Sequence, residues 1–289
     1  MDYIQNTQDK QDKIVKIKNS KVQHGVSNDR IYLMHLEKSD VPYIIDELDN
    51  LSQVQNYSKI FAKVQRSECP SFLEKGYVSE AIIPGFFRGL EECVFMSKYF
   101  DPKRGLEIDR KLNSRVLSTA ISKRNSKAAS FMASSCTDFS FRLALPEDAF
   151  QMADLYSAVF DSYPFPVFDP EYIKSTMAEN IVYFCLWKGD ELAAVSSCEM
   201  DVDNLNVEMT DFAVLPKCRG KSLSLSLLYQ MENQMKKNGI KTAYTIARAN
   251  SFGMNITFSK CGYAFAGRLV KNTQIGGNIE DMNVWYKQL

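Results

Sequence analysis

A short basic turn that contains a glycine joins an apolar segment to an amphipathic one. The turn has the sequence Lys217-Cys218-Arg219-Gly220-Lys221-Ser222, and its neighbours predict a strand over 206–215 and a helix over 222–237. The free N–H groups and the dipole of a helix N-terminus attract anions, and a glycine lets a ligand approach the backbone closely. The segment therefore predicts an anion site, with a phosphate group as its natural ligand.

The cysteines and histidines offer no second kind of chemical site. Seven cysteines are scattered without a CxxC pair, and the two histidines, His24 and His35, both lie near the N-terminus. This distribution argues against a disulfide framework, a zinc site and a Cys-His or Ser-His-Asp device in the C-terminal half. Cys218 and Cys261 are disfavoured as nucleophiles because no histidine lies near either of them. We predict no metal site.

Composition and charge narrow the class of protein. The chain has 289 residues, of which 45% are hydrophobic and 24% charged, as in globular proteins. Its 35 basic and 35 acidic residues cancel, so no overall field favours nucleic acid or an anionic membrane as a partner. No apolar stretch reaches membrane-spanning length, and the N-terminus lacks the apolar core of a signal peptide. We therefore expect a cytoplasmic protein.

The turn lies within a long series of predicted elements that begins near residue 138. Their order is β-α-β-β-β-α-β-α-β-β, which predicts an α/β fold of the α+β type with a mixed sheet. Strands are expected at 139–144, 181–187, 192–201, 206–215, 242–247, 263–270 and 279–287, and helices at 146–160, 222–237 and 252–259.

The preceding residues predict a smaller α/β domain over 29–102. Its strands are expected at 31–36, 58–64, 78–87 and 93–100, and its helix at 41–51. The order of these elements suggests a degenerate copy of the later domain. Residues 1–28 are polar and predict a flexible tail, with a loosely attached first strand as the alternative. Residues 103–137 predict a helical connector, whose basic residues we interpret as a solvated helix face rather than as an anion-binding surface.

The turn resembles the acetyl-CoA signature of the GNAT superfamily, in which a Q/R-x-x-G-x-G/A turn wraps the CoA pyrophosphate after the fourth strand. Lys217 and Ser222 depart mildly from that pattern. The resemblance implies a GNAT acyltransferase fold over 138–289 and acetyl-CoA as co-substrate. It also implies strand residues for the pantetheine arm and a cradle for the pyrophosphate. These residues are Phe212, Ala213, Val214, Arg219, Gly220, Lys221, Ser222 and Leu223.

The segment from Asn255 to Tyr263 resembles the family's helix ending in Y-x-K-x-G-F, which closes over the CoA thiol. The resemblance adds Asn255 and Phe258 to the expected cofactor residues. Many members have a tyrosine where this chain has Phe258, and its hydroxyl protonates the departing thiolate. Phenylalanine cannot do so, which leaves the general acid unassigned. A non-catalytic CoA-binding sensor module is therefore kept as an alternative.

Several further segments resemble the β-lysine N-acetyltransferase family over most of residues 30–289. They are Tyr163–Pro170, Glu208–Phe212, Gly267–Asn272 and Glu280–Lys287 in the later domain, and Ile83–Gly89 and Met96–Phe100 in the first. The resemblance implies acetylation of the terminal N6 amine of β-lysine, which lysine 2,3-aminomutase supplies. The product would serve as a compatible solute in osmoadaptation. Another small amine or a protein lysine remains an alternative acceptor.

The resemblance also implies the chemical roles. Histone-type members have a base glutamate at the position of Glu208, six residues before Val214. Such a base is useful because an alkylamine with a pKa of about 10.4 is almost fully protonated at neutral pH. Asp211 is the reserve candidate, although its odd offset predicts the opposite face of the strand. The amine would attack the thioester directly, helped by a backbone N–H near Val214. A surface charge is the alternative for either carboxylate.

The expected acceptor site lies in the loop after the first helix of the 138–289 domain, where this fold usually admits its acceptor. Tyr163, Phe165 and Asp169 lie in this loop, and Arg268 could pair with the acceptor's carboxylate. The alternative is a proline-stiffened loop that packs its aromatic side chains into the core. A homodimer is compatible with the sequence.

Overall fold

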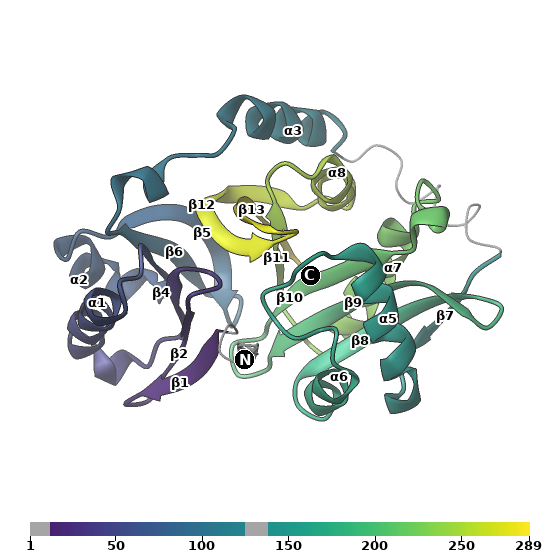
Figure 1. Cartoon of the computed structure of the whole chain (residues 1–289), viewed down its shortest axis with the longest axis horizontal. Helices are drawn as coiled ribbons and strands as arrows, with labels where there is room; N and C mark the ends of the chain where they lie inside the picture. Colours follow the sequence, from purple (N-terminus) through teal and green to yellow (C-terminus); the bar gives the residue numbers. More distant parts are fainter. Residues whose placement is uncertain (1–11, 125–137) are drawn as a thin grey trace, which may run out of the picture.

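The computed structural model describes residues 12–124 and 138–289. Their strands form one sheet of 13 strands in which the first six strands make an N-terminal half and the others a C-terminal half (Figure 1). The strand order is β1-β2-β3-β4-β6-β5-β12-β13-β11-β10-β9-β8-β7. Neighbouring strands are antiparallel except for the parallel pairs β3 with β4 and β10 with β11. The predicted α/β class with a mixed sheet is confirmed.

The N-terminal half contains six strands and two α-helices. They are β1 (Lys13–Ile17), β2 (Ser20–Gly25), β3 (Arg30–His35), α1 (Tyr43–Gln55), β4 (Lys59–Gln65), α2 (Cys69–Glu74), β5 (Val78–Phe87) and β6 (Glu91–Tyr99). The helix α3 (Arg110–Ser122) then leads toward the C-terminal half.

Within residues 138–289, the C-terminal half contains the other seven strands and four α-helices. They are β7 (Ser140–Leu143), α5 (Ala149–Val159), α6 (Pro170–Met177), β8 (Ile181–Lys188), β9 (Glu191–Asp201), β10 (Asn206–Val214), α7 (Leu223–Lys237), β11 (Thr242–Arg248), α8 (Phe252–Lys260), β12 (Ala264–Ile275) and β13 (Asn278–Gln288). The predicted elements are all present, and α2, α6, β1 and β2 were missed.

The two halves repeat one topology. The N-terminal order β1-β2-β3-β4-β6-β5 matches the C-terminal order β8-β9-β10-β11-β13-β12, element for element. In each half a helix, α1 or α7, connects the third strand to a parallel fourth strand, and α2 or α8 leads to the last hairpin. The halves meet where β5 pairs with β12, which are equivalent strands. At the level of topology, the interpretation of the first domain as a degenerate copy is confirmed.

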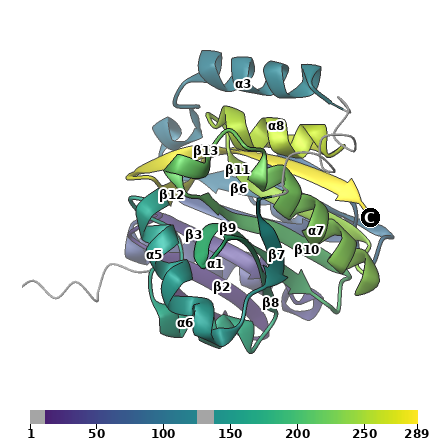
Figure 2. The same ribbon diagram turned by 90° about the vertical axis from the view of Figure 1, so that its right-hand side faces the viewer.

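Helices cover both faces of the C-terminal half. Helix α7 packs Leu227, Leu228 and Met231, at helical spacing, against the strands on one face. Helices α5 and α6 pack on the other face, where Tyr156 and Ile173 are fully buried (Figure 2). The strands β10 and β11 are thereby fixed on both faces, which positions the residues at their ends.

A shared core joins the two halves. It combines Tyr32 and Phe61 of the N-terminal strands with Tyr244, Leu269 and further buried residues of the C-terminal strands. This core crosses the β5–β12 junction, so both halves contribute side chains to it. That residues 29–102 and 138–289 form separate domains stays a prediction.

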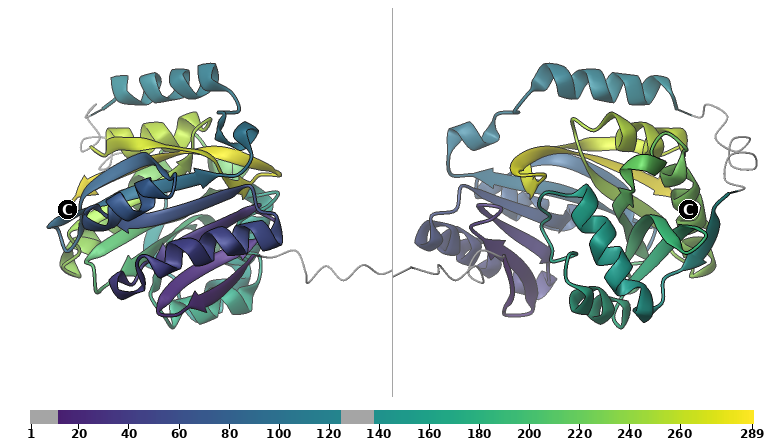
Figure 3. Two further views of the ribbon diagram at one scale, coloured as in Figure 1. Left: turned by 90° about the vertical axis from the view of Figure 1, so that its left-hand side faces the viewer. Right: turned by 45° about the vertical axis from the view of Figure 1, so that its right-hand side comes forward.

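The connector helix α3 lies across α8 (Figure 3). The side chain of Asp109 caps it by accepting a hydrogen bond from the Leu112 N–H (2.9 Å), and Val116 and Ala120 are buried. The part of the predicted connector at 125–137 lies outside the described residues. In the ranges that the structure covers, no helix combines the length and apolarity needed to cross a bilayer.

The prediction of a flexible tail over 1–28 is wrong for residues 13–25, which form β1 and β2. Strand β1 is an edge strand of the sheet, and three of its five side chains are apolar, of which Val15 and Ile17 pack against the core of the N-terminal half. Strand β2 is buried, but its buried side chains include the polar Gln23 and His24. The polar residues around β1 and those within β2 concealed the two strands.

Candidate active site

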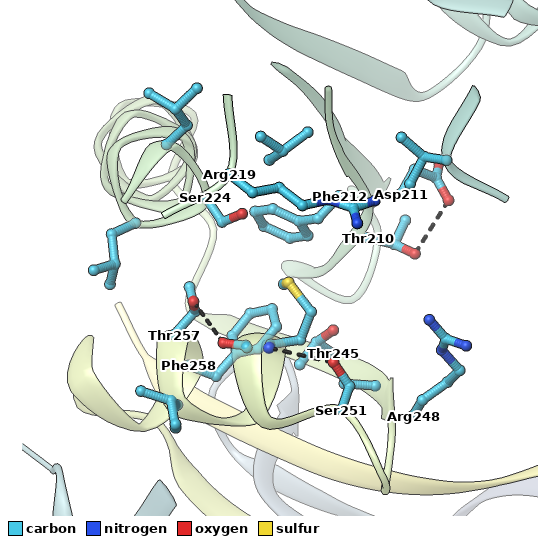
Figure 4. A pocket seen from close by; sticks show the side chains of 18 of the residues that line it. Thr210, Asp211, Phe212, Arg219, Ser224, Thr245, Arg248, Ser251, Thr257 and Phe258 are labelled. Atoms are coloured by element: carbon cyan, nitrogen blue, oxygen red, sulfur yellow. Dashed lines mark hydrogen bonds between the residues drawn. The ribbon is translucent and has the colours of Figure 1, made fainter. Parts of the chain in front are cut away.

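A cavity opens where β10 and β11 separate. The two strands pair in parallel over Asn206–Glu208 and Thr242–Tyr244. Beyond this pairing, a cavity of about 540 Å³ lies between the strands and the N-terminal ends of α7 and α8 (Figure 4). Backbone N–H and C=O groups need hydrogen-bond partners, so this edge of β10 is suited to a ligand that carries amide groups.

The turn between β10 and α7 forms one end of the cavity. Gly220 and Ser222 both have positive φ, 78° and 61°, and α7 begins at the next residue, Leu223. The Ser222 side chain does not cap the helix, which leaves that end to another acceptor. Arg219, Gly220, Ser222 and Leu223 line the cavity. An uncapped helix end beside an arginine fits the pyrophosphate of CoA.

The other expected cofactor residues have different positions. Phe212 and Val214 line the cavity, whereas the Ala213 side chain lies on the opposite face in the core beneath α5. The ammonium of Lys221 lies 5.5 Å from the centre of the Phe139 ring rather than in the cavity. Neither Ala213 nor Lys221 lines the cavity, and their role as cofactor residues stays a prediction.

Phe258 forms part of the cavity wall. Its ring is fully buried and contacts that of Phe212 edge-on, with 5.6 Å between the ring centres. Figure 4 shows Phe258 and Thr257 facing Phe212 across the cavity. The phenyl ring shapes this wall but provides no proton, as the sequence predicts.

Asn255, expected among the cofactor residues, does not line the cavity. Asn255 is fully buried, and its amide donates to the carbonyls of Arg248 (2.9 Å) and Ser251 (2.7 Å). Its oxygen accepts from Asn283 and from the Trp285 indole, both at 2.8 Å. These four bonds tie α8 to β11 and β13, so Asn255 fixes the helix that carries Phe258.

Arg248 and Ser251 are among the cavity residues that the sequence analysis missed. Arg248 ends β11, and Ser251 caps α8 by accepting a hydrogen bond from the Met254 N–H (3.5 Å). Both lie at the edge of the sheet where the cavity opens (Figure 4). Arg248 could have been found from the sequence, because it is a basic residue that ends a strand next to the predicted anion site.

A second cavity of about 290 Å³ adjoins the first and extends between the two halves. Several residues line both cavities, so the two spaces meet at the middle of β10. These residues are Tyr163, Thr210, Asp211, Ile246, Ile275 and Met282. A molecule in the second cavity would face the inner end of the first.

Glu208 and Asp211 both line this second cavity. The register of β10 against β9 shifts between Thr210 and Ala213, and Asp211 has a positive φ of 55°. This bulge turns Asp211 to the face that Glu208 and Thr210 already share. The prediction that Asp211 points to the opposite face is wrong, because strict alternation does not hold through a bulge.

The surroundings of Glu208 suit a general base. Burial raises its pKa to about 7, and the charge of Glu199, its cross-strand neighbour on β9, acts in the same direction. Lys63 and a hydrogen bond from the Tyr244 hydroxyl oppose this rise in pKa. A carboxyl group with a pKa near neutrality can accept a proton at physiological pH. Lys63 comes from β4, so the N-terminal half contributes to this environment.

Asp211 is held differently. Its carboxylate accepts hydrogen bonds from the hydroxyls of Tyr163, Ser197 and Thr210, the last at 3.3 Å. Burial raises the pKa of Asp211, while these hydrogen bonds counteract the rise. Because its oxygens are already engaged, Asp211 is better suited to holding Tyr163 in place than to taking a proton.

Of the four expected acceptor residues, Tyr163 and Phe165 line the second cavity. Asp169 is exposed and caps α6 through the Glu171 N–H (2.9 Å), so its prediction as a substrate residue is wrong. Arg268 donates to Glu107 ahead of α3 (2.6 Å) and to Asn283 of β13 (2.9 Å) and does not line the cavity, so its prediction is also wrong. Asp169 and Arg268 are each bonded to groups of the protein itself, which explains why neither charge is directed toward an acceptor.

Comparisons with known proteins agree with this geometry. The model of the Acetyltransferase (GNAT) family matches residues 151–263. A β-lysine N(6)-acetyltransferase of Methanococcus maripaludis is 42% identical over 278 residues, which cover 96% of this chain and 98% of that protein. The chain belongs to the GNAT family of acetyltransferases. It is an acetyl-CoA-dependent N-acetyltransferase with the GNAT fold in its C-terminal half.

Two further relatives support this assignment. The N-acetyltransferase YodP of Bacillus subtilis is 32% identical to this GNAT enzyme, covering 92% of this chain and 94% of its own. A β-lysine N(6)-acetyltransferase of Methanosarcina mazei is 32% identical, covering 74% of this chain and 85% of its own. The first relatives match along both halves, so the similarity extends beyond the GNAT segment. The alternative of a non-catalytic sensor module is not supported.

Proposed function

We propose that this enzyme transfers the acetyl group of acetyl-CoA to the N6 amine of β-lysine. The observation that carries the proposal is the 42% identity to a β-lysine N(6)-acetyltransferase across 96% of the chain. The second cavity supports it, because Glu199, Glu208 and Asp211 line its wall. Such a wall suits an acceptor with two ammonium groups.

We propose Glu208 as the general base. It takes a proton from the N6 ammonium, and the neutral amine then attacks the thioester carbon. The new C–N bond forms as the C–S bond breaks, and the sulfur leaves as a thiolate. The second proton that the nitrogen loses in becoming an amide passes to this thiolate, directly or through solvent. A thiol pKa of about 8.5 allows it to leave without a dedicated acid, which is consistent with Phe258. A backbone N–H of β10 near Val214 would stabilise charge on the carbonyl oxygen.

The shape of the second cavity, called the acceptor cavity from here on, favours a small amine over a protein lysine. Both halves line the space, whose volume is about 290 Å³. A folded protein would have to present its lysine through this enclosed region, whereas a free diamino acid fits within it. The N-terminal half thus belongs to the acceptor site in this proposal.

The proposal includes a cellular setting that follows from the resemblance in the sequence. Lysine 2,3-aminomutase would supply β-lysine, and the N6-acetylated product would serve as a compatible solute in osmoadaptation. We place the enzyme in the cytoplasm, and the buried free thiols of Cys93, Cys185 and Cys198 are typical of a reducing compartment. Assembly as a homodimer stays a prediction.

A thiol-release assay over a panel of acceptors tests the proposal. We expect β-lysine to have a kcat/KM at least about tenfold above those of α-lysine, the decarboxylated diamine and a lysine-containing peptide. β-Lysine and α-lysine differ in where the second amine is attached, so a fixed site for that amine must discriminate between them. Equal rates across the panel, or no turnover of β-lysine, would contradict the proposal.

A further inference from the structure

A second group of polar side chains lines the acceptor cavity. These residues are distant in sequence from the carboxylates Glu199, Glu208 and Asp211. Strands β2 and β3 of the N-terminal half contribute Gln23 and Arg30, and β12 contributes Asn272 and Thr273. Figure 1 shows β2 and α6, which both line this cavity, on the facing sides of the two halves. Nothing in the reaction at Glu208 requires these groups.

Arg30 is a buried cation without an ion pair in the described part of the chain. Its side chain is 4% exposed, and burial lowers its pKa to about 10. Its Nη1 donates to the Asn272 carbonyl and to the Thr273 hydroxyl (3.3 Å), and the described residues provide no hydrogen bond to its Nε or Nη2. Asp12 attracts Arg30 at longer range, but its carboxylate is bound by Asn28. A buried guanidinium of this kind is suited to a ligand carboxylate.

Two buried amide oxygens lie on the same wall. Gln23 is 2% exposed and Asn272 is 1% exposed, and their side-chain oxygens have no hydrogen-bond partner among the described residues. An unpaired buried polar atom costs about 1–3 kcal/mol, so native proteins rarely keep one without a reason. An ammonium group in the cavity is the kind of donor that such an oxygen can accept from.

The spacing suits a short diamino acid. Arg30 and Tyr32 alternate on β3, so their side chains share one face about 7 Å apart along the strand. The Arg30 guanidinium lies 5.2 Å from the centre of the Tyr32 ring, and Tyr32 also neighbours Glu208. Six bonds separate the carboxyl carbon from the N6 nitrogen in β-lysine, which is about 7 Å when extended. Tyr32 and Phe61, stacked at 4.8 Å, offer an apolar wall for the methylenes between.

We propose that Arg30, Gln23 and Asn272 form a receptor for the amino-acid end of the acceptor. Arg30 binds its carboxylate, and the amide oxygens of Gln23 and Asn272 bind its β-ammonium group, while the N6 amine reaches Glu208. The N-terminal half thereby selects diamino acids over plain diamines. This inference rests on the proposed function, and it replaces Arg268 with Arg30 as the partner of the carboxylate.

The first test compares substrates that lack one group. In Arg30→Gln, we expect kcat/KM for β-lysine to fall about 100-fold and that for the decarboxylated diamine to change less than about threefold, because only β-lysine loses a charged hydrogen bond. Equal losses for the two substrates would mean that Arg30 has only a structural role and would overturn the inference.

A second variant keeps the test decisive if Arg30→Gln fails to fold. Gln23→Met has a similar volume and removes the unpartnered amide oxygen, so Tm should stay the same or rise. We expect kcat/KM for β-lysine to fall about tenfold, with little change for the ω-amino acid that lacks the β-amino group. Unchanged kinetics with β-lysine would overturn the ammonium site.

Gln65→Met is the matched control. Gln65 also has an unpartnered buried oxygen, but it lies on β4 away from the acceptor cavity. We expect it to leave both substrates unaffected. If wild-type enzyme does not acetylate β-lysine, the proposed function fails; if it does and Gln23→Met and Gln65→Met behave alike, only the receptor fails.

Discussion

Glu208→Gln is expected to lower kcat/KM for β-lysine by about 10²- to 10³-fold at pH 7, because the variant removes the base but keeps the size of the side chain. The pKa of Glu208 is raised to about 7, so wild-type activity should fall as pH decreases through 7 and the carboxylate becomes protonated. The variant can use only acceptor that is already neutral. Its deficit should therefore shrink as pH rises toward the amine pKa of about 10. The measurement is kcat/KM between about pH 5 and pH 10.

Two variants near Glu208 act as controls because they should move the pH profile in opposite directions. Glu199 raises the pKa of Glu208, so Glu199→Gln should shift the acidic limb to lower pH. Lys63 lowers that pKa, so Lys63→Met should shift the limb to higher pH. Full turnover by Glu208→Gln across the pH range would rule out Glu208 as the base.

Gly267→Ala is expected to lower the free energy of unfolding by about 3 kcal/mol or more. Gly267 is the residue of β12 that pairs with Ala81 of β5, with a φ of 151°. A Cβ atom there would lie 2.1 Å from the Glu80 carbonyl oxygen and 2.6 Å from the Ala81 Cα. Because these are backbone atoms, the junction between the halves would have to open. Calorimetric unfolding measures the change in Tm.

Gly239→Ala is the control, because it measures the cost of an unfavourable backbone conformation without a steric clash. Gly239 also has a positive φ, 78°, but an added Cβ would meet nothing within 4 Å. Its cost should be about 1 kcal/mol, and its activity should be unchanged. Equal unfolding free energies for the two variants would show that the close approach at Gly267 does not hold the halves together.

The sequence predicted the part of the site that depends on local order. A strand, a basic turn with Gly220 and a helix follow each other directly between Asn206 and Lys237, so their meeting place is determined by chain continuity. Glu208 lines the second cavity, whereas Phe212 and Val214, at even offsets from it, line the first. Asp211 could not be placed, because a bulge interrupts the strand's period of two and leaves no pattern in the residue types.

The contribution of the N-terminal half could not be predicted. Arg30 contacts Asn272 across 242 positions of sequence, and Lys63 neighbours Glu208 only because the halves share a core. Strand β2 was missed because two of its buried side chains are polar, which hid a strand that lines the acceptor cavity. Arg268 looked available for a carboxylate until the fold paired it with Glu107.

A crystal structure of the enzyme with CoA and β-lysine tests the central claim most directly. We predict that the N6 amine lies within hydrogen-bond distance of Glu208 at the meeting point of the two cavities, with the carboxylate on Arg30. CoA should run along β10 to the turn at Gly220. β-Lysine bound in the reverse orientation, or away from the N-terminal half, would contradict this account.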